Sequence, residues 1–273
     1  MVSISDLAKK SRVHRTTISR RFSNVKTQPK ILPLNSLPSE LILVLDATQI
    51  ASKKLLSLVY EYTSSQPLAW SFPERESYFS WQELLTVIKL HFRVMAVVSD
   101  GQKGLRKAIK EVFPEAIHQR CIAHVIRLSL AWLTKNPQTE AGKLLRDLVL
   151  ILSEVKTEAE GKIWSKSFIL WNEKYDFFLK EKSHNPLTGR SWPTHKKLRA
   201  VRSLIKNALP DLFWFLKNEK IPSTTNIVEG GINALISESL RRHRGIKIEQ
   251  KEQLICEFLR DRRKRKLSTR NAT

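Results

Sequence analysis

Two aspartates stand where apolar segments end, at positions from which a buried strand would reach the edge of a sheet. Asp46 ends the run LILVLD, and Asp100 ends the run VMAVVSD. Ligands bind at the carboxyl ends of strands in open α/β sheets, and paired carboxylates there can hold divalent metal ions that also accept phosphate oxygens. An Asp after a strand also often caps the next turn or helix. Two such residues in one sheet favour metal binding and predict two-metal phosphoryl transfer.

A site of this kind needs a third acid, and Glu229 is the candidate. It lies in the segment STTNIVEGGINALISESLRRHRG, where Ser223 or Thr224 can cap a helix that runs toward Leu240. By pattern alone, two other acids are rivals for the role: Glu219 and Glu238.

The same segment ends in a basic cluster. The cluster consists of Arg241, Arg242 and Arg244. We expect these side chains to contact DNA beside the reacting phosphate. The alternative is a solvated helix end whose positive charges favour the helix dipole, with Gly245 ending the helix.

The elements that must position the three acids follow a regular order. Short runs rich in branched and aromatic residues at 41–50, 55–63 and 66–72 predict three strands joined as a meander. Alternating helices and strands then follow, at 80–92, 94–101, 102–113, 116–121 and 122–133. This order is typical of the ribonuclease-H-like fold, an α/β architecture.

The remaining chain is divided by composition. The first part of the core is expected at 40–136, and a helical insertion follows at 137–220. The core then ends with the helix at 221–248 that carries Glu229. Residues 249–273 are expected to be a basic C-terminal tail, in which DRRKRK reads equally well as a solvated face.

Residues 1–24 contain two short segments whose apolar residues recur at helical spacing, which predicts a small all-α helix-turn-helix. The second helix leaves an Arg-rich outer face suited to the major groove of DNA, and its residues are Arg15, Thr16, Thr17, Arg20 and Arg21. A proline-containing stretch at 25–39 has no periodicity and is expected to be a linker.

The charge of the chain points to a polyanionic partner. The formal net charge is +22, far more than solubility requires. The excess is concentrated in residues 1–30 and 241–273. Double-stranded DNA is therefore the expected partner.

Cysteine content and hydropathy indicate a cytoplasmic protein without membrane contact, and with DNA as its expected partner it would be associated with the nucleoid. Cys121 and Cys256 are too few for a disulfide framework or a four-thiolate zinc site. The most apolar stretch, 144–152, is about half the roughly 20 residues of a membrane span.

Four motifs together carry a family resemblance: DATQI, VVSDGQKGL, CIAH and TTNIVEGGINALISESLRRHRG. The chain resembles the Mutator-like superfamily of bacterial insertion-sequence transposases over roughly residues 40–245, and the last motif is the most specific. The resemblance implies a DDE-type recombinase whose acids are Asp46, Asp100 and Glu229, with two Mg²⁺ or Mn²⁺ ions. It also places Cys121 and His124 near the active site, without implying that they bind metal.

The implied activity is metal-dependent cleavage and strand transfer at element ends, followed by attack of the freed 3′-hydroxyl on target DNA, by a homodimer or higher oligomer. Relatives often carry a zinc ribbon before the helix-turn-helix, whereas this sequence starts directly at the latter. A second hypothesis is therefore an inactive or truncated remnant that binds DNA sequence-specifically. A third is a ribonuclease H or junction nuclease, which would not call for a sequence-reading module.

Overall fold

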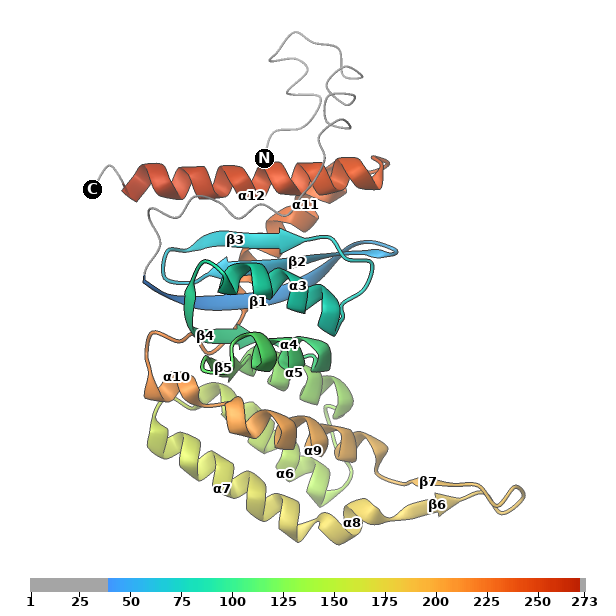
Figure 1. Ribbon diagram of the computed structural model, residues 1–273. Coiled ribbons are helices and arrows are strands. Elements are labelled where there is room, and N and C mark those ends of the chain that lie inside the picture. The colour runs from blue at the N-terminus through green and yellow to red at the C-terminus, as the bar shows by residue number, and fades with distance from the viewer. Residues whose placement is uncertain (1–38, 271–273) are drawn as a thin grey trace. The chain divides into compact units, whose positions relative to one another are not determined.

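The computed structural model describes residues 39–270, with side chains as far as Arg262. The described chain forms two compact units (Figure 1). Unit 1 contains residues up to 97, residues 102–117 and the chain from 225 onward, and unit 2 contains residues 98–101 and 118–224. The predicted helix-turn-helix and the linker as far as residue 38 lie outside the described residues.

A five-stranded mixed sheet has the order β3-β2-β1-β4-β5. Its strands are β1 (Glu40–Ala51), β2 (Lys54–Glu61), β3 (Gln66–Ser71), β4 (Arg93–Ser99) and β5 (Ile117–Arg120). The first three pair antiparallel, as a meander requires. The expected α/β class is confirmed, and each predicted strand agrees with an observed one to within two residues at either end.

Strand β1 is continuously apolar from Leu41 to Leu45, where both of its faces are buried. Leu41, Leu43 and Leu45 point into a core to which α3 (Tyr78–Lys89) and α4 (Lys103–Val112) also contribute buried side chains. Successive side chains of a strand point to opposite faces, so Ile42 and Val44 are buried on the other side. The side chain of the predicted acid on β1 shares that second face.

The C-terminal part of unit 1 differs from the continuous helix expected there. A π-helix, η3 (Ile227–Asn233), is followed by α11 (Ala234–Arg242). Residues expected as a basic tail form α12 (Ile248–Arg270), which lies along β3. The helix is held because its apolar side chains are buried, among them Cys256, whose sulfur accepts a hydrogen bond from Trp70 Nε1 at 3.2 Å.

Unit 2 is mainly helical, as the sequence predicts for the insertion. Its longer helices are α5 (Ile122–Trp132), α6 (Glu140–Ile151), α7 (Glu158–Lys174) and α9 (Lys196–Ala208). Shorter elements connect them, namely η1 (Leu152–Glu154), α8 (Asp176–Lys180), η2 (Leu209–Asp211) and α10 (Trp214–Lys217). Aromatic side chains at helical spacing on α7 stack in the core of this unit: Trp164, Phe168 and Trp171.

The sequence did not predict one feature of unit 2. A two-stranded hairpin, β6 (Lys182–His184) paired with β7 (Ser191–Pro193), extends from the helices (Figure 1). Its strands are three residues long, too short to give a periodic signal. Across residues 39–270, no helix is both long and apolar enough to span a bilayer.

Candidate active site

Asp46 lies in the middle of β1, the central strand of the sheet, and not at the strand end that was expected for it. Its side chain is only 7% exposed. Its Oδ2 accepts a hydrogen bond of 2.6 Å from Nδ2 of Asn233, a residue 187 positions later in the chain. Asn233 is itself buried. A buried carboxylate is costly unless hydrogen bonds satisfy its oxygens, so this contact helps the sheet to tolerate an acid at this depth.

Glu229 lies on the π-helix that also supplies Asn233. The two residues are four positions apart, a spacing that places side chains on the same side of a helix. The N–H of Glu229 donates to the carbonyl of Thr225 at 3.1 Å, which holds the start of this turn. The structure therefore packs the segment that carries Glu229 against the strand that carries Asp46.

The wide π-helical turn has a local cause in the sequence. Gly230 and Gly231 follow Glu229 directly, and two adjacent glycines weaken an α-helix. A Cβ added at either glycine would meet no atom within 4 Å, so the space beside Glu229 is open. Single π-helical turns occur often at functional sites.

The two rival acids have other surroundings. Glu238 forms an ion pair with Arg242 one turn further along α11. Glu219 belongs to unit 2, in the loop after α10. Neither shares the turn that contacts Asp46, so Glu229 remains the better candidate for the third acid.

Asp100 follows β4 in unit 2 and is half-buried. The next residue, Gly101, has a φ of +77°, a conformation that glycine adopts without strain. The Arg120 guanidinium covers this glycine, because an added Cβ would lie 0.7 Å from Arg120 Nη1. Only glycine permits a buried arginine to approach the turn after Asp100 so closely. The convergence of Asp100 with Asp46 and Glu229 stays a prediction.

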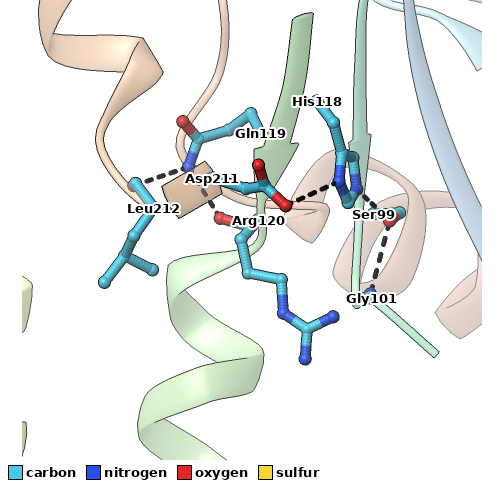
Figure 2. A network of polar contacts seen from close by, with 7 residues as sticks. All are labelled: Ser99, Gly101, His118, Gln119, Arg120, Asp211 and Leu212. Atoms are coloured by element: carbon cyan, nitrogen blue, oxygen red, sulfur yellow. Dashed lines mark hydrogen bonds and ion pairs between the residues drawn. The ribbon is translucent and has the colours of Figure 1, made fainter. Parts of the chain in front are cut away.

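A chain of polar contacts fixes the strand end beside Asp100 (Figure 2). Ser99 Oγ lies 2.8 Å from Nε2 of His118, and His118 Nδ1 lies 3.2 Å from Oδ2 of Asp211. Ser99 Oγ also accepts from the N–H of Gly101 at 3.3 Å. The order of groups is that of a Ser-His-Asp triad, but Ser99 is fully buried and cannot attack a substrate. The network instead ties β4 to β5 and η2.

Gln119 makes a second connection between β5 and the same part of unit 2. Its Nε2 donates to the carbonyl of Leu212 at 2.9 Å, and its Oε1 accepts from the N–H of Phe215 at 3.0 Å. The side chain is fully buried, so these bonds replace those it would make to water. Figure 2 shows Gln119 and His118 pointing to opposite sides of β5, each toward a residue of the 209–215 region.

Cys121 and His124 lie together at the start of α5. His124 Nδ1 is 3.3 Å from Cys121 Sγ, and Cys121 is a buried free thiol. Burial lowers the pKa of His124, but its contact with Cys121 and the charge of Asp100 outweigh burial and leave the pKa raised, although Arg127 opposes them. The charge of Asp100 therefore acts on His124, and the location of this pair near the active site stays a prediction.

The predicted DNA-contacting residues divide into two groups. Arg15, Thr16, Thr17, Arg20 and Arg21 lie outside the described residues. The second group lies at the end of α11 and is exposed: Arg241, Arg242 and Arg244. Gly245 has a φ of +86°, as expected of a glycine just past a helix end.

Within the described residues, no three His, Cys, Asp or Glu side chains are gathered so that they could hold a metal ion. Two of the predicted ligands belong to unit 1 and the third to unit 2. As a donor set, three carboxylates suit Mg²⁺ and Mn²⁺, which prefer oxygen ligands.

Sequence reasoning missed Asn233 and the pair formed by His118 and Asp211. Asn233 carries a weak signal, because it follows Glu229 at helical spacing on the same predicted helix. His118 and Asp211 are 93 positions apart and lie in segments whose pattern indicated only a strand and a helical insertion.

An α/β sheet with carboxylates at its strands, in a chain of net charge +22, defines a class of protein suited to nucleic acid. Comparison with known proteins narrows this class. The family model "Transposase, Mutator family" matches residues 64–181, a stretch that includes Asp100, Cys121 and His124 and excludes Asp46 and Glu229.

Three curated relatives agree with that match. They are a probable insertion-sequence transposase of Corynebacterium diphtheriae (23% identity, 41% of this chain, 35% of the relative), the ISRM5 transposase of Rhizobium meliloti strain 1021 (29%, 51% and 36%) and the IS905 transposase of Lactococcus lactis subsp. lactis strain IL1403 (28%, 46% and 32%). The predicted resemblance is confirmed: over residues 64–181 this chain is similar to the Mutator family of transposases. It spans about a third of the length of these relatives.

A solved structure of a simian T-cell lymphotropic virus intasome in complex with PP2A regulatory subunit B56 gamma aligns with 69% of this chain and 72% of that chain, at 13% identity. Its TM-score of 0.26 is too low to support an argument about fold or function.

Proposed function

We propose that this chain is the catalytic part of a DDE-type transposase that cuts and joins DNA at the ends of an insertion sequence. The observation that carries the proposal is the hydrogen bond from Asn233 to Asp46, which packs the segment of Glu229 against the strand of Asp46. Two of the three acids expected from the sequence thus lie on elements in direct contact, although they are 183 positions apart in the chain.

The fold that we propose for the core is ribonuclease-H-like, preceded by a DNA-reading helix-turn-helix at 1–24. Support for the core comes from the strand order β3-β2-β1-β4-β5, in which β1, which carries Asp46, and β4, which precedes Asp100, are neighbours. Support for the helix-turn-helix comes from sequence alone.

Asp46, Asp100 and Glu229 would hold two Mg²⁺ or Mn²⁺ ions. When bound, such ions activate a water or 3′-hydroxyl for in-line attack and stabilise charge on the transferring phosphate. The protein contributes by holding its carboxylates in place. Asn233 fixes one oxygen of Asp46, and the turn at Gly101 fixes the backbone beside Asp100. Preorganised ligands of this kind avoid a reorganisation cost during the reaction.

His124 has a supporting role in this proposal. Its raised pKa favours the positively charged imidazolium, which would attract a DNA phosphate near Asp100. Cys121 is buried behind it and orients the ring. A zinc site at this pair would need two further ligands.

The test is cleavage of a labelled duplex that carries an element end, with Mg²⁺. Asp46→Asn, Asp100→Asn and Glu229→Gln should each lower the rate by on the order of 10³-fold, since metal-ion catalysis contributes several kcal/mol. Binding of the duplex should be retained. The matched control is Glu238→Gln, which removes a carboxylate from α11 and should leave the rate nearly unchanged.

The same assay distinguishes the proposed function from its alternatives. Binding without cleavage by the wild-type chain would support a DNA-binding remnant instead. Cleavage that ignores the terminal inverted repeat would support a general nuclease. Full activity of Glu229→Gln together with an inactive Glu238→Gln would exchange their roles.

A further inference from the structure

A second basic region, separate in sequence from the arginines at the end of α11, lies in unit 2. Residues 182–210 contain no Asp or Glu. They contain seven Lys and Arg side chains: Lys182, Arg190, Lys196, Lys197, Arg199, Arg202 and Lys206. This acid-free stretch is 29 residues long. It covers the β6–β7 hairpin and the whole of α9.

The tip of the hairpin is held in one shape by its own hydrogen bonds. Asn185 Oδ1 accepts from the N–H groups of Leu187 and Thr188, at 2.8 and 3.1 Å. The Asn185 carbonyl accepts from the N–H of Gly189 at 2.9 Å, and Gly189 has a φ of +65° that suits the turn. This fixed turn presents Pro186 and Leu187 to solvent, and Leu187 is 94% exposed.

The base of the hairpin is anchored to the helices of the same unit. The ring of His195, which precedes α9, stacks on Phe178 of α8 with centroids 3.7 Å apart. His195 Nε2 also lies 2.9 Å from Glu181 Oε2, and the N–H of Thr194 donates to the Glu181 carbonyl at 3.0 Å. A hairpin anchored at its base and closed at its tip is suited to rigid recognition, since little order must be gained on binding.

Nearby acids do not cancel the charge of this region. Asp176 is shared by Lys180 and Arg202, at 2.6 and 2.9 Å, and Glu181 contacts His195. Four other basic side chains are exposed to solvent: Lys182, Arg190, Lys196 and Lys197. We call the surface formed by these four residues and the tip at 186–187 the hairpin surface.

We propose that the hairpin surface is a second binding site for duplex DNA. Its four basic side chains would contact phosphates, and Pro186 and Leu187 would enter a groove and contact base edges. Apolar wedges on DNA-binding proteins include Pro and Leu, and they act where basic residues hold the flanking backbone. The inference rests on the proposed function only for the choice of DNA as the polyanion.

The charge pattern favours DNA over a protein partner. Phosphates along a duplex are regularly spaced, so several separate Lys and Arg side chains can each neutralise one and release counterions. The exposed apolar side chains of the hairpin are Pro186, Leu187 and the 44% exposed Trp192. This set is too small to anchor a stable protein interface, which usually buries about 800 Å² on each partner.

The experiment is a titration of a duplex of about 30 base pairs, or roughly 100 Å at 3.4 Å per pair, with the full chain. It is repeated over a series of salt concentrations and without divalent metal. The variant carries Lys182→Gln, Arg190→Gln, Lys196→Gln and Lys197→Gln together. The slope of log affinity against log salt should become shallower by roughly 0.9 for each phosphate that is no longer neutralised, so by about 2 or more. Its helix content and unfolding midpoint should match the wild type, since all four side chains are exposed.

A matched control removes the same charge from the same unit. It carries Gln at four exposed lysines elsewhere: Lys135, Lys143, Lys162 and Lys166. This variant should keep nearly the wild-type slope. If both variants show the same reduction in slope, the effect is that of net charge and the proposed surface is wrong.

A separate variant, Leu187→Asn, tests the apolar tip. It should weaken binding by about tenfold with no change in salt slope, as expected when an apolar side chain of this size is removed from an interface. Unchanged affinity would remove the tip from the proposed site. A wild-type chain with no salt-dependent binding would refute DNA as the ligand altogether. Unchanged slope in the hairpin variant alone would overturn only this inference and leave the proposed function standing.

Discussion

Asp46 and Asp100 both follow apolar runs, yet the protein holds them in different ways. Asp46 is inside a sheet buried on both faces, and one identified hydrogen bond reaches it from a helix far along the chain. Asp100 is half-buried and follows the end of a strand. The described contacts are made by its two neighbours: Ser99 lies against His118, and Gly101 lies against Arg120. The contact described for Asp46 reaches the carboxylate itself, and the contacts described for Asp100 fix the backbone on either side of it.

This difference has a consequence for mutation. Changes near Asp46 should act by removing a hydrogen bond from a buried carboxylate. Changes near Asp100 should act through the shape of a turn, and their cost should depend on whether a substitution fits the backbone. Variants at the two places should therefore differ in the size and the cause of their effects.

The largest effect on stability is expected at the turn after Asp100. Gly101→Ala places a Cβ at positive φ, which costs roughly 1–2 kcal/mol. The new Cβ would also lie 0.7 Å from Nη1 of the buried Arg120, and such overpacking adds about 1–3 kcal/mol. Chemical denaturation at equilibrium measures the decrease in unfolding free energy.

Gly189→Ala is the matched control for Gly101→Ala. Gly189 also has positive φ, but a Cβ there would meet no atom within 4 Å, so only the backbone cost applies. Equal decreases in the two variants would show that Arg120 does not constrain the turn.

The next effect is expected beside Asp46. Asn233→Leu keeps the size of the side chain but removes the donor to a buried carboxylate, which should lower the unfolding free energy by about 1–3 kcal/mol. Ser237→Ala, at an exposed position on the following helix, should change it by less than about 0.5 kcal/mol. A neutral Asn233→Leu would mean that Asp46 does not need this hydrogen bond.

A smaller effect is expected in the network behind Asp100. Asp211→Asn keeps the shape of the acid but weakens its bond to His118, and should cost about 1 kcal/mol, the usual net value of a partly buried hydrogen bond. Under the proposed function, it should also lower DNA cleavage more than it lowers DNA binding. Asn207→Ala, at an exposed position on α9, serves as the control. Equal behaviour of the two variants in stability and cleavage would leave the network without a positioning role.

The sequence predicts the strands well because their patterns are local. The runs that end at Asp46 and Asp100 are continuous and apolar, as strands buried on both faces must be, and the helices between them have clear periodicity. Glu229 could be selected from three acids because the motif around it resembles that of the Mutator-like transposases.

Other parts of the site depend on contacts that no local pattern contains. The bond between Asn233 and Asp46 joins residues that are distant in sequence, and the π-helical turn arises where two glycines follow Glu229. The last helix was missed because Arg and Lys dominate its composition, whereas its burial against β3 depends on a few apolar residues such as Leu254 and Leu259.

The smallest effect is expected from His124, through pH. Burial lowers its pKa, but the contact with Cys121 and the charge of Asp100 outweigh burial and Arg127, so the pKa is raised in the folded chain. A histidine with a raised pKa stabilises the folded state fully below the unfolded pKa of about 6.5, and this contribution disappears as pH rises through the folded value. The unfolding free energy of the metal-free chain, measured from about pH 5.5 to about pH 8.5, should therefore show a decline that His124→Gln lacks.

Cys121→Ala should weaken the decline, because it removes the largest influence that raises this pKa. A decline of the same size in all three proteins would assign it to other groups and would leave His124 without the proposed charge next to Asp100.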